Sequence, residues 1–207
     1  MSLKLIHFPQ TRSLRILWLI EELKLDVDVE TRPFDRASLK TDDYLKLNPL
    51  GKTPVFFDGE KRFVESIAII QYLSEKYADG KLSRRQSASD FGEFLQWLHF
   101  GEAGMGPYVG MLAAHTVLLP EEKRIPEIEQ WAEGETLNCL NFLESELPDD
   151  GYLLNEFSLA DISVGYILFL LKITGNGRLF GPKTNNYFNK IRSRDGWIVA
   201  SGIEPNM

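Results

Sequence analysis

The stretch LKLIHFPQTRSLRILWLIEEL, residues 3–23, decides the fold of the chain. Leu3 to Phe8 is a short β-type run, and the polar turn PQTRS follows it. The next apolar positions fall at helical spacing and form one broad buried face: Ile16, Leu17, Leu19, Ile20 and Leu23. A strand that leads through a short turn into an amphipathic helix is typical of an α/β unit.

The rest of the first eighty residues extends this pattern. The sequence predicts a half-exposed strand at 27–32, a short helix at 39–47, a turn-rich loop at 47–52, two strands joined at Asp58-Gly59, and a helix at 65–77. The resulting order is βαβ, a helix, then ββα. Such an order indicates an α/β domain over residues 1–80 with a mixed sheet.

The second half of the chain differs in composition. Residues 78–89 are polar and small, as linkers are. Amphipathic patterns then predict helices at Asp90–Ala114, Pro126–Leu147, Ser158–Leu171 and Thr184–Arg194. Ser158 and Asp161 have the spacing of a capping box before an apolar run. We therefore expect an all-helical domain over residues 87–207, and a fold class of α/β plus all-α.

Composition excludes several classes of protein. The chain has 207 residues, 23 basic against 30 acidic residues, a formal charge of −7, and one cysteine, Cys139. A disulfide framework and a cysteine metal cluster are excluded, and a reducing compartment is indicated. The acidity disfavours a nucleic-acid partner. No signal-peptide pattern and no apolar run of about 20 residues appears, so we expect a cytoplasmic protein without a membrane partner.

Five segments, through their order and spacing along the chain, resemble the cytosolic glutathione transferase family over nearly the whole chain. They are HFPQTRSLRILWLIEEL, LNPLGKTPVF, Glu65-Ser66 at a helix start with FSLADISV, and QWLHFGEAGMGP, the last similar to the fourth helix of bacterial and fungal members. The resemblance implies a thioredoxin-like N-terminal domain, glutathione as co-substrate, and a homodimer in which the third and fourth helices face the partner.

The resemblance also implies which residues hold glutathione. Helix N-termini bind anions, so the γ-glutamyl carboxylate would meet Ser66 and the ammonium would meet Glu65. The Thr53-Pro54 bond would be cis, so that the Thr53 backbone pairs with the cysteinyl backbone. Lys52 would face the glycyl carboxylate. The residues alone also fit a second interpretation, in which Glu65 and Ser66 complement the helix dipole and Lys52 is an ordinary loop lysine.

The turn after the first strand determines the sulfur chemistry. Thioredoxin-like folds can place a Cys-x-x-Cys pair here, but Gln10 to Ser13 contains no cysteine, so the reactive sulfur would belong to the ligand. A hydroxyl directed at that sulfur would stabilise its thiolate. We rank Thr11 first, Ser13 second and Gln10 third for this role. The alternative is that Thr11 or Ser13 is the N-cap of the first helix.

Four residues near the glycine-rich middle of the first predicted helix of the second domain are candidates for the electrophile pocket: Phe100, Met105, Tyr108 and Met111. Core packing is the alternative for each of them. His7, His99 and His115 share no metal-ligand spacing, so no metal is expected. The predicted function is a glutathione transferase acting in detoxification. The alternatives are a glutathione-dependent disulfide or peroxide reductase and a non-catalytic binding protein.

Overall fold

The computed structural model describes residues 2–202, which form two compact units. Unit 1 consists of residues 2–83 together with 194–202, and unit 2 is Arg84–Ser193. The expected division at residues 80 and 87 differs from this one chiefly at the C-terminus. The helix Asp195–Ser201, the last one among the described residues, belongs to unit 1, although the sequence placed it in the helical domain.

Unit 1 is built on a four-stranded mixed sheet of order β2-β1-β3-β4. The strands are β1 (Leu3–His7), β2 (Asp28–Thr31), β3 (Val55–Asp58) and β4 (Lys61–Phe63). β1 pairs in parallel with β2 and antiparallel with β3, and β3 and β4 form the hairpin expected at Asp58-Gly59. This is the thioredoxin-like arrangement that the sequence predicted.

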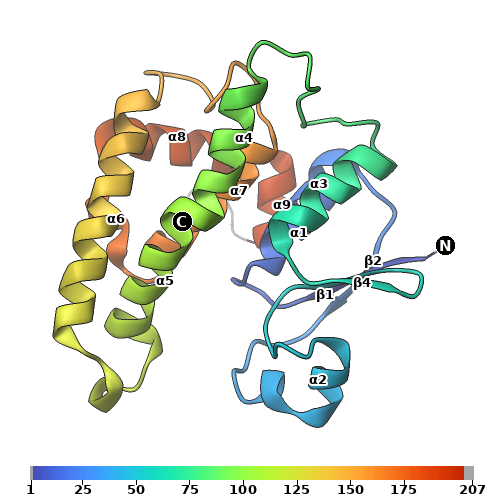
Figure 1. Ribbon diagram of the computed structural model, residues 1–207, viewed down its shortest axis with the longest axis horizontal. Coiled ribbons are helices and arrows are strands. Elements are labelled where there is room, and N and C mark those ends of the chain that lie inside the picture. Colours follow the sequence, from blue (N-terminus) through green and yellow to red (C-terminus); the bar gives the residue numbers. More distant parts are fainter. Residues whose placement is uncertain (1, 203–207) are drawn as a thin grey trace. The chain divides into compact units, whose positions relative to one another are not determined.

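Helices cover both faces of this sheet. Figure 1 shows α1 (Ser13–Leu23) and α3 (Ser66–Tyr77) on one side and α2 (Asp42–Leu47) on the other. Alternate residues of β1 pack on opposite faces of the sheet, because successive side chains of a strand point to opposite faces. On the α2 side, Ile6 and Val55 pack in one cluster with Phe8, Leu39 and Tyr44.

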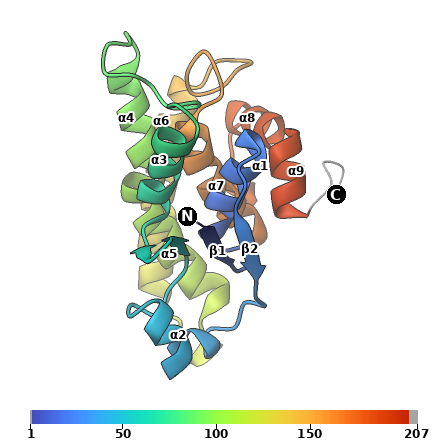
Figure 2. The same cartoon turned by 90° about the vertical axis from the view of Figure 1, so that its right-hand side faces the viewer.

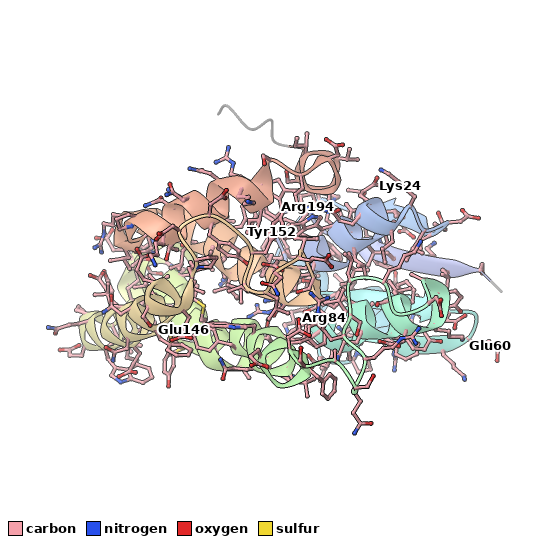
Figure 3. The ribbon with its side chains drawn as sticks, turned by 90° about the horizontal axis from the view of Figure 1, so that it is seen from above. Lys24, Glu60, Arg84, Glu146, Tyr152 and Arg194 are labelled. Carbon is pink, nitrogen blue, oxygen red and sulfur yellow. The ribbon has the colours of Figure 1, made fainter. Side chains whose placement is uncertain are left out.

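The C-terminal helix α9 (Asp195–Ser201) completes unit 1 and lies beside α1 (Figure 2). The rings of Trp18 and Trp197 meet edge to face at 4.8 Å. Glu22 of α1 accepts hydrogen bonds from Arg194 Nε and Nη2 at 2.8 and 2.7 Å. Arg194 is labelled in Figure 3. The sequence pattern did not predict α9, because seven residues are too few to show a helical period.

Unit 2 is helical, as predicted. Its α-helices are α4 (Phe91–His99), α5 (Gly106–Ala113), α6 (Pro126–Glu146), α7 (Leu159–Ile173) and α8 (Pro182–Arg192). α7 is almost wholly buried and forms the core of the unit. The predicted capping box is confirmed, since Ser158 N–H donates to Asp161 Oδ2 at 2.8 Å and Ser158 Oγ accepts from Ala160. Among residues 2–202, no helix has both the length and the apolar character required to span a bilayer.

The single helix expected at Asp90–Ala114 is divided in the structure. The π-helical segment η2 (Phe100–Met105) separates α4 from α5, and a second one, η3 (Ala114–Leu118), extends α5. Gly101 lies so close to α7 that a Cβ there would meet the carbonyl carbon of Ser163 at 2.6 Å. Close contact with the central helix therefore accompanies the change of helical pitch, which the apolar pattern could not reveal.

Candidate functional site

The turn between β1 and α1 carries the three ranked candidates for thiol activation. Gln10 is exposed and has a left-handed backbone with φ 63°. Thr11 is half-buried, and its Oγ1 donates to the carbonyl of Phe8 at 2.8 Å and lies 3.0 Å from Ser13 Oγ. The N-cap of α1 is Arg12, which makes no side-chain cap, so the alternative that Thr11 or Ser13 is the N-cap is wrong.

Ser13 has a different environment from Thr11. Its side chain is fully buried, and its Oγ accepts from Phe8 N–H at 3.0 Å, lies 3.0 Å from the Phe8 carbonyl, and is 2.9 Å from His7 Nδ1. These partners hold the end of β1 against the start of α1. Of the two hydroxyls, only that of Thr11 belongs to a side chain that is partly exposed.

His7 is buried beside Ser13, with 4% of its surface exposed. Burial lowers its pKa to about 4, and a backbone hydrogen bond with Ser13 acts in the opposite direction. The imidazole is therefore neutral at pH 7. The sequence suggested a structural or exposed position for His7 and did not reveal its link to Ser13.

The second part of the site is the loop before β3, where the Thr53-Pro54 bond is cis as predicted. β1 and β3 are antiparallel, with Ile6 opposite Val55. Continuing this register brings Pro54 beside His7 and Thr53 beside Phe8. The loop and the β1–α1 turn therefore lie next to each other at one edge of the sheet.

Three side chains that the sequence analysis missed hold this loop. Tyr44 Oη and Asn48 Nδ2 both donate to the carbonyl of Lys52, at 2.7 and 2.6 Å, and Lys40 Nζ donates to the carbonyl of Gly51 at 3.1 Å. Burial raises the pKa of Tyr44 to about 12, so its hydroxyl remains a donor. The side chain of Lys52 is exposed. The one sequence signal for this support is the glycine at position 51. In the structure its φ is 56°, a left-handed backbone conformation that residues with a Cβ rarely adopt.

The third part of the site is the start of α3. Glu65 is the N-cap residue, is exposed, and makes no side-chain cap. Ser66 is buried, and its Oγ accepts from Arg15 Nη1 at 3.1 Å. The hydroxyl of Ser66 keeps its own proton, which can be donated to a ligand. Fully buried Arg15 thus ties the N-terminal half of α1 to the N-terminus of α3.

These three parts have a common electrostatic character. Neither α1 nor α3 has an acidic residue in its first turn, and neither has a side-chain cap. The positive end of each helix dipole favours an anion or a thiolate near it. Unit 1 therefore combines the partly exposed hydroxyl of Thr11, the backbone of the loop at Thr53, and the N-termini of α1 and α3.

The four residues proposed for an electrophile pocket lie in different surroundings within unit 2. The ring of Phe100 contacts Phe142 at 5.4 Å and that of Tyr108 contacts Trp131 at 5.5 Å, so both pack against α6. Met105 is fully buried, whereas Met111 is 38% exposed.

A groove of about 660 Å³ along α6 has none of these four residues in its lining. Its walls come from Pro126, Glu129, Gln130, Glu133, Gly134 and Leu137. The lining has neither a hydroxyl nor a thiol, and it belongs to unit 2, whereas the Thr11 turn belongs to unit 1. We therefore base the candidate site on the Thr11 turn and its neighbours, and not on this groove.

The remaining candidates have structural surroundings. His115 is buried, and its Nδ1 accepts from Ile125 N–H at 3.0 Å. Cys139 is half-buried, and burial raises the pKa of its thiol. Among residues 2–202, no three His, Cys, Asp or Glu side chains are grouped so that they could hold a metal ion.

Comparison with known proteins agrees with this geometry. The family model of the glutathione S-transferase N-terminal domain matches residues 1–75. Glutathione S-transferase 1 of Schizosaccharomyces pombe is 32% identical over 168 residues, which cover 77% of this chain and 72% of that protein. Glutathione S-transferase F10 of Arabidopsis thaliana is 30% identical over 170 residues, with 77% of each chain covered.

A solved structure extends the similarity to nearly the whole chain. The glutathione transferase URE2P8 of Phanerochaete chrysosporium, determined with oxidized glutathione, is 27% identical, with a TM-score of 0.80 over 96% of this chain and 93% of that one. The sequence similarity extends beyond the N-terminal domain, and the fold matches over both units. The chain belongs to the glutathione S-transferase family.

Proposed function

We propose that the protein binds reduced glutathione in unit 1, stabilises its thiolate through Thr11, and transfers it to a small hydrophobic electrophile. The observation that carries this proposal is the contrast between two neighbouring hydroxyls. Ser13 is fully buried among backbone groups and His7, while Thr11 is partly exposed at the start of α1. Thr11 therefore combines a proton donor with a positive helix end.

Glutathione would be held by groups at the same edge of the sheet. The Thr53 backbone would pair with the cysteinyl backbone, and Ser66 with the N-terminus of α3 would receive the γ-glutamyl carboxylate. Glu65 and Lys52 are both exposed, so they would meet the ammonium and the glycyl carboxylate. This set places local donors around an anionic ligand, although the formal charge of the chain is −7.

The chemical step uses the ligand's own sulfur. A free thiol has a pKa of about 8.5, and a hydrogen bond to the thiolate lowers that value. The Thr11 hydroxyl and the dipole of α1 would both favour the ionised sulfur. The thiolate then attacks the electrophilic carbon, a C–S bond forms, and the leaving group departs with the electron pair of its bond.

Glutathione binding is the first test of this function. Isothermal titration of the protein with reduced glutathione should show one site per chain at submillimolar to millimolar ligand. Absence of binding at millimolar glutathione would favour a non-catalytic protein of the same fold. Titration with the oxidised disulfide provides a matched comparison.

The reaction type is the second test. We expect conjugation of an aryl halide by the wild-type protein, followed as the rate of thioether formation. Reduction of a mixed disulfide or a peroxide by glutathione should be slow, because Gln10 to Ser13 contains no cysteine to take part in exchange. A protein that reduces these substrates faster than it conjugates would be the reductase alternative.

The electrophile would be bound by unit 2 residues, among which we propose Phe100, Met105, Tyr108 and Met111. Met111 is the most exposed of these four residues, so its side chain is open to contact with a ligand. Tyr108 carries the one hydroxyl among the four. Replacement of Tyr108 by Phe should change kcat/KM differently for different electrophiles. The affinity for glutathione should stay unchanged in this variant.

The assembly and setting of the protein are further parts of the proposal. We expect a homodimer in which α3 and α4 face the partner, as the resemblance to the family implies. Sedimentation should give about twice the chain mass of 23.7 kDa. We also propose a cytoplasmic location and a role in detoxification, in keeping with conjugation of apolar electrophiles and with a single cysteine.

A further inference from the structure

The buried His7 has no role in the mechanism above, yet two hydrogen bonds connect its ring to Thr11. His7 Nδ1 lies 2.9 Å from Ser13 Oγ, and Ser13 Oγ lies 3.0 Å from Thr11 Oγ1. The three side chains form a line that runs from the interior at the end of β1 to the partly exposed Thr11. A line of this kind can transmit the orientation of a proton without moving a heavy atom.

Counting protons shows that this line has two ordered states. The oxygen of Ser13 has two lone pairs, and one of them accepts from Phe8 N–H at 3.0 Å. If His7 carries its proton on Nδ1, it fills the second lone pair, and Thr11 cannot donate to Ser13. If Nδ1 is bare, Ser13 donates to it, and the second lone pair is left to accept from Thr11.

The two states differ in the direction of the Thr11 proton. With a protonated Nδ1, the Ser13 proton is directed to the Phe8 carbonyl, 3.0 Å away, or to Thr11 Oγ1, 3.0 Å away. The Phe8 carbonyl is also close to Thr11 N at 3.3 Å and to Thr11 Oγ1 at 2.8 Å, so it is crowded with donors. A thiolate next to Thr11 would then be the better acceptor for the Thr11 proton. With a bare Nδ1, Ser13 Oγ becomes a further acceptor that competes with the sulfur for the Thr11 proton.

We propose that His7 is a positioning residue for the proposed reaction: as an Nδ1–H donor to Ser13, it directs the Thr11 hydroxyl proton towards the sulfur of bound glutathione. This inference rests on the proposed function, since the sulfur belongs to the ligand. His7 itself touches neither the ligand nor the reacting atoms.

The surroundings of His7 suit such a role. The ring is buried and neutral at pH 7, so it holds one proton, which can lie on either nitrogen. Its neighbour Ser13 is fully buried, which keeps water from competing for the hydrogen bonds of the line. The register of β1 and β3 places His7 beside the cis-proline loop, so that both parts of the site share this rigid edge.

The tautomer of His7 can be read directly in the wild-type protein. Nitrogen NMR of ¹⁵N-histidine-labelled protein separates protonated from bare Nδ1, and the chain has three histidines, which keeps the assignment tractable. The expected result is a protonated Nδ1 at His7 in the complex with glutathione. A bare Nδ1 in that complex would overturn the proposal and leave the proposed function intact.

A double-mutant cycle on the thiol pKa of bound glutathione tests the coupling. His7→Leu removes the donor and should raise that pKa by about one unit, equivalent to a tenfold loss of thiolate near neutral pH. His7→Asn, whose amide nitrogen can occupy the place of Nδ1, should restore most of the shift. In a Thr11→Val background, His7→Leu should cause no further change.

Other outcomes of the cycle have definite meanings. An equal shift from His7→Leu in both backgrounds would show that His7 acts by general packing and not through Thr11, which overturns the inference. If His7→Leu does not fold, the NMR experiment on the wild-type protein still decides the matter. Failure of the wild-type protein to bind glutathione would refute the proposed function, and this inference with it.

Discussion

Thr11 and Ser13 are only two residues apart, yet the fold gives their hydroxyls different tasks. Ser13 Oγ is surrounded by Phe8 and His7 and joins the end of β1 to the start of α1. Thr11 lies nearer the surface than Ser13 and is partly exposed. A short turn can thus supply one hydroxyl that maintains its own geometry and another that is available for chemistry.

Removal of the Thr11 hydroxyl should impair the reaction. Thr11→Val keeps the shape of the side chain and deletes its proton donor, and a hydrogen bond to a charged group stabilises by about 1.5–3 kcal/mol. We therefore expect kcat/KM for aryl-halide conjugation to fall roughly ten- to a hundredfold. Initial rates at saturating glutathione measure this change.

Two further variants are controls for that prediction. Thr11→Ser retains the hydroxyl and should keep most of the activity. Ser13→Ala should lower the free energy of unfolding, because it leaves the buried N–H of Phe8 without its acceptor. Undiminished conjugation by Thr11→Val would show that another group stabilises the thiolate.

At this scale the sequence suggested candidate residues but not their hydrogen-bond partners. The turn composition led to Thr11, and the helix start led to Ser66. The bond from Arg15 to Ser66 joins positions 51 residues apart, and the bonds of Tyr44 and Asn48 end on a backbone carbonyl. Pairings of this kind depend on the three-dimensional path of the chain, which local patterns do not contain.

Among the elements, the loop that precedes β3 depends on one glycine. Gly51 has a φ of +56°, and a Cβ there would lie 2.6 Å from Lys40 Nζ and 2.8 Å from the carbonyl of Leu39. Gly59 has nearly the same φ, +57°, but a Cβ there would meet nothing within 4 Å. The two glycines therefore form a matched pair: a replacement would meet equal backbone strain at both, but unequal space.

Replacement of each glycine by alanine should separate these effects. Gly59→Ala should cost about 1–2 kcal/mol, the usual penalty for a left-handed non-glycine residue. Gly51→Ala should cost more, and it should also weaken glutathione binding, because the clash displaces the loop that carries Lys52 and Thr53. Chemical denaturation and isothermal titration give the two quantities. Equal losses of stability and unchanged binding in both variants would contradict this account of the loop.

A second element-scale feature joins the β3–β4 hairpin to α3. Asp58 Oδ2 accepts from Tyr72 Oη at 2.5 Å, from Lys76 Nζ at 2.7 Å and from Tyr77 Oη at 2.7 Å. These hydrogen bonds, first that of Lys76, hold the pKa of Asp58 well below its usual range. Because β3 follows the cis-proline loop and α3 begins at Ser66, this cluster fixes two parts of the site to each other.

Stability should depend on the charge of Asp58 in a definite direction. A carboxyl whose pKa is lowered by folding stabilises the folded state above its ordinary pKa of about 3.9, and this contribution disappears as the pH falls towards the folded-state value. Asp58→Asn should therefore lower the free energy of unfolding at pH 7, and the difference from wild type should shrink below about pH 4.

The control for this variant is an exposed ion pair in the same unit. Asp43 and Lys46 on α2 lie 2.9 Å apart, with side-chain exposures of 93% and 74%. Asp43→Asn should change stability by less than about 1 kcal/mol. Denaturant titrations at several pH values compare the two variants, and a constant deficit of Asp58→Asn from pH 7 down to pH 3 would rule out the ionic contribution.

The elements themselves were mostly predictable, for clear reasons. The Asp58-Gly59 turn and the Ser158–Asp161 capping box are local, and the structure confirms both. The π-helical segments were not predictable, since η2 occurs where Gly101 meets the distant Ser163. Helix α9 was missed because its stability comes from packing on α1 and not from its own pattern.

For the whole molecule, the main consequence of α9 is that unit 1 is discontinuous in sequence. The chain begins in unit 1, builds unit 2, and returns to unit 1 at Arg194. The return is secured by the Trp18–Trp197 contact and by the bonds from Arg194 to Glu22. The proposed glutathione site in unit 1 therefore depends on α9.

Shortening a buried residue of α9 should destabilise unit 1. Trp197 is 3% exposed, so Trp197→Ala should cost about 3–5 kcal/mol, whereas Val199 on the same helix is 59% exposed and Val199→Ala should have little effect. Hydrogen exchange should show the loss of protection in β1 and α1. Normal protection there in Trp197→Ala would contradict the role assigned to α9.

The proposed function requires one property, a glutathione thiol that ionises more readily on the protein than in water. The most direct measurement is an ultraviolet absorbance titration of the thiolate in the complex of wild-type protein and glutathione. We predict an apparent pKa at least one unit below the value of about 8.5 for a free thiol. A bound thiol that titrates at the free value would contradict the central claim, whatever the affinity of the protein for glutathione.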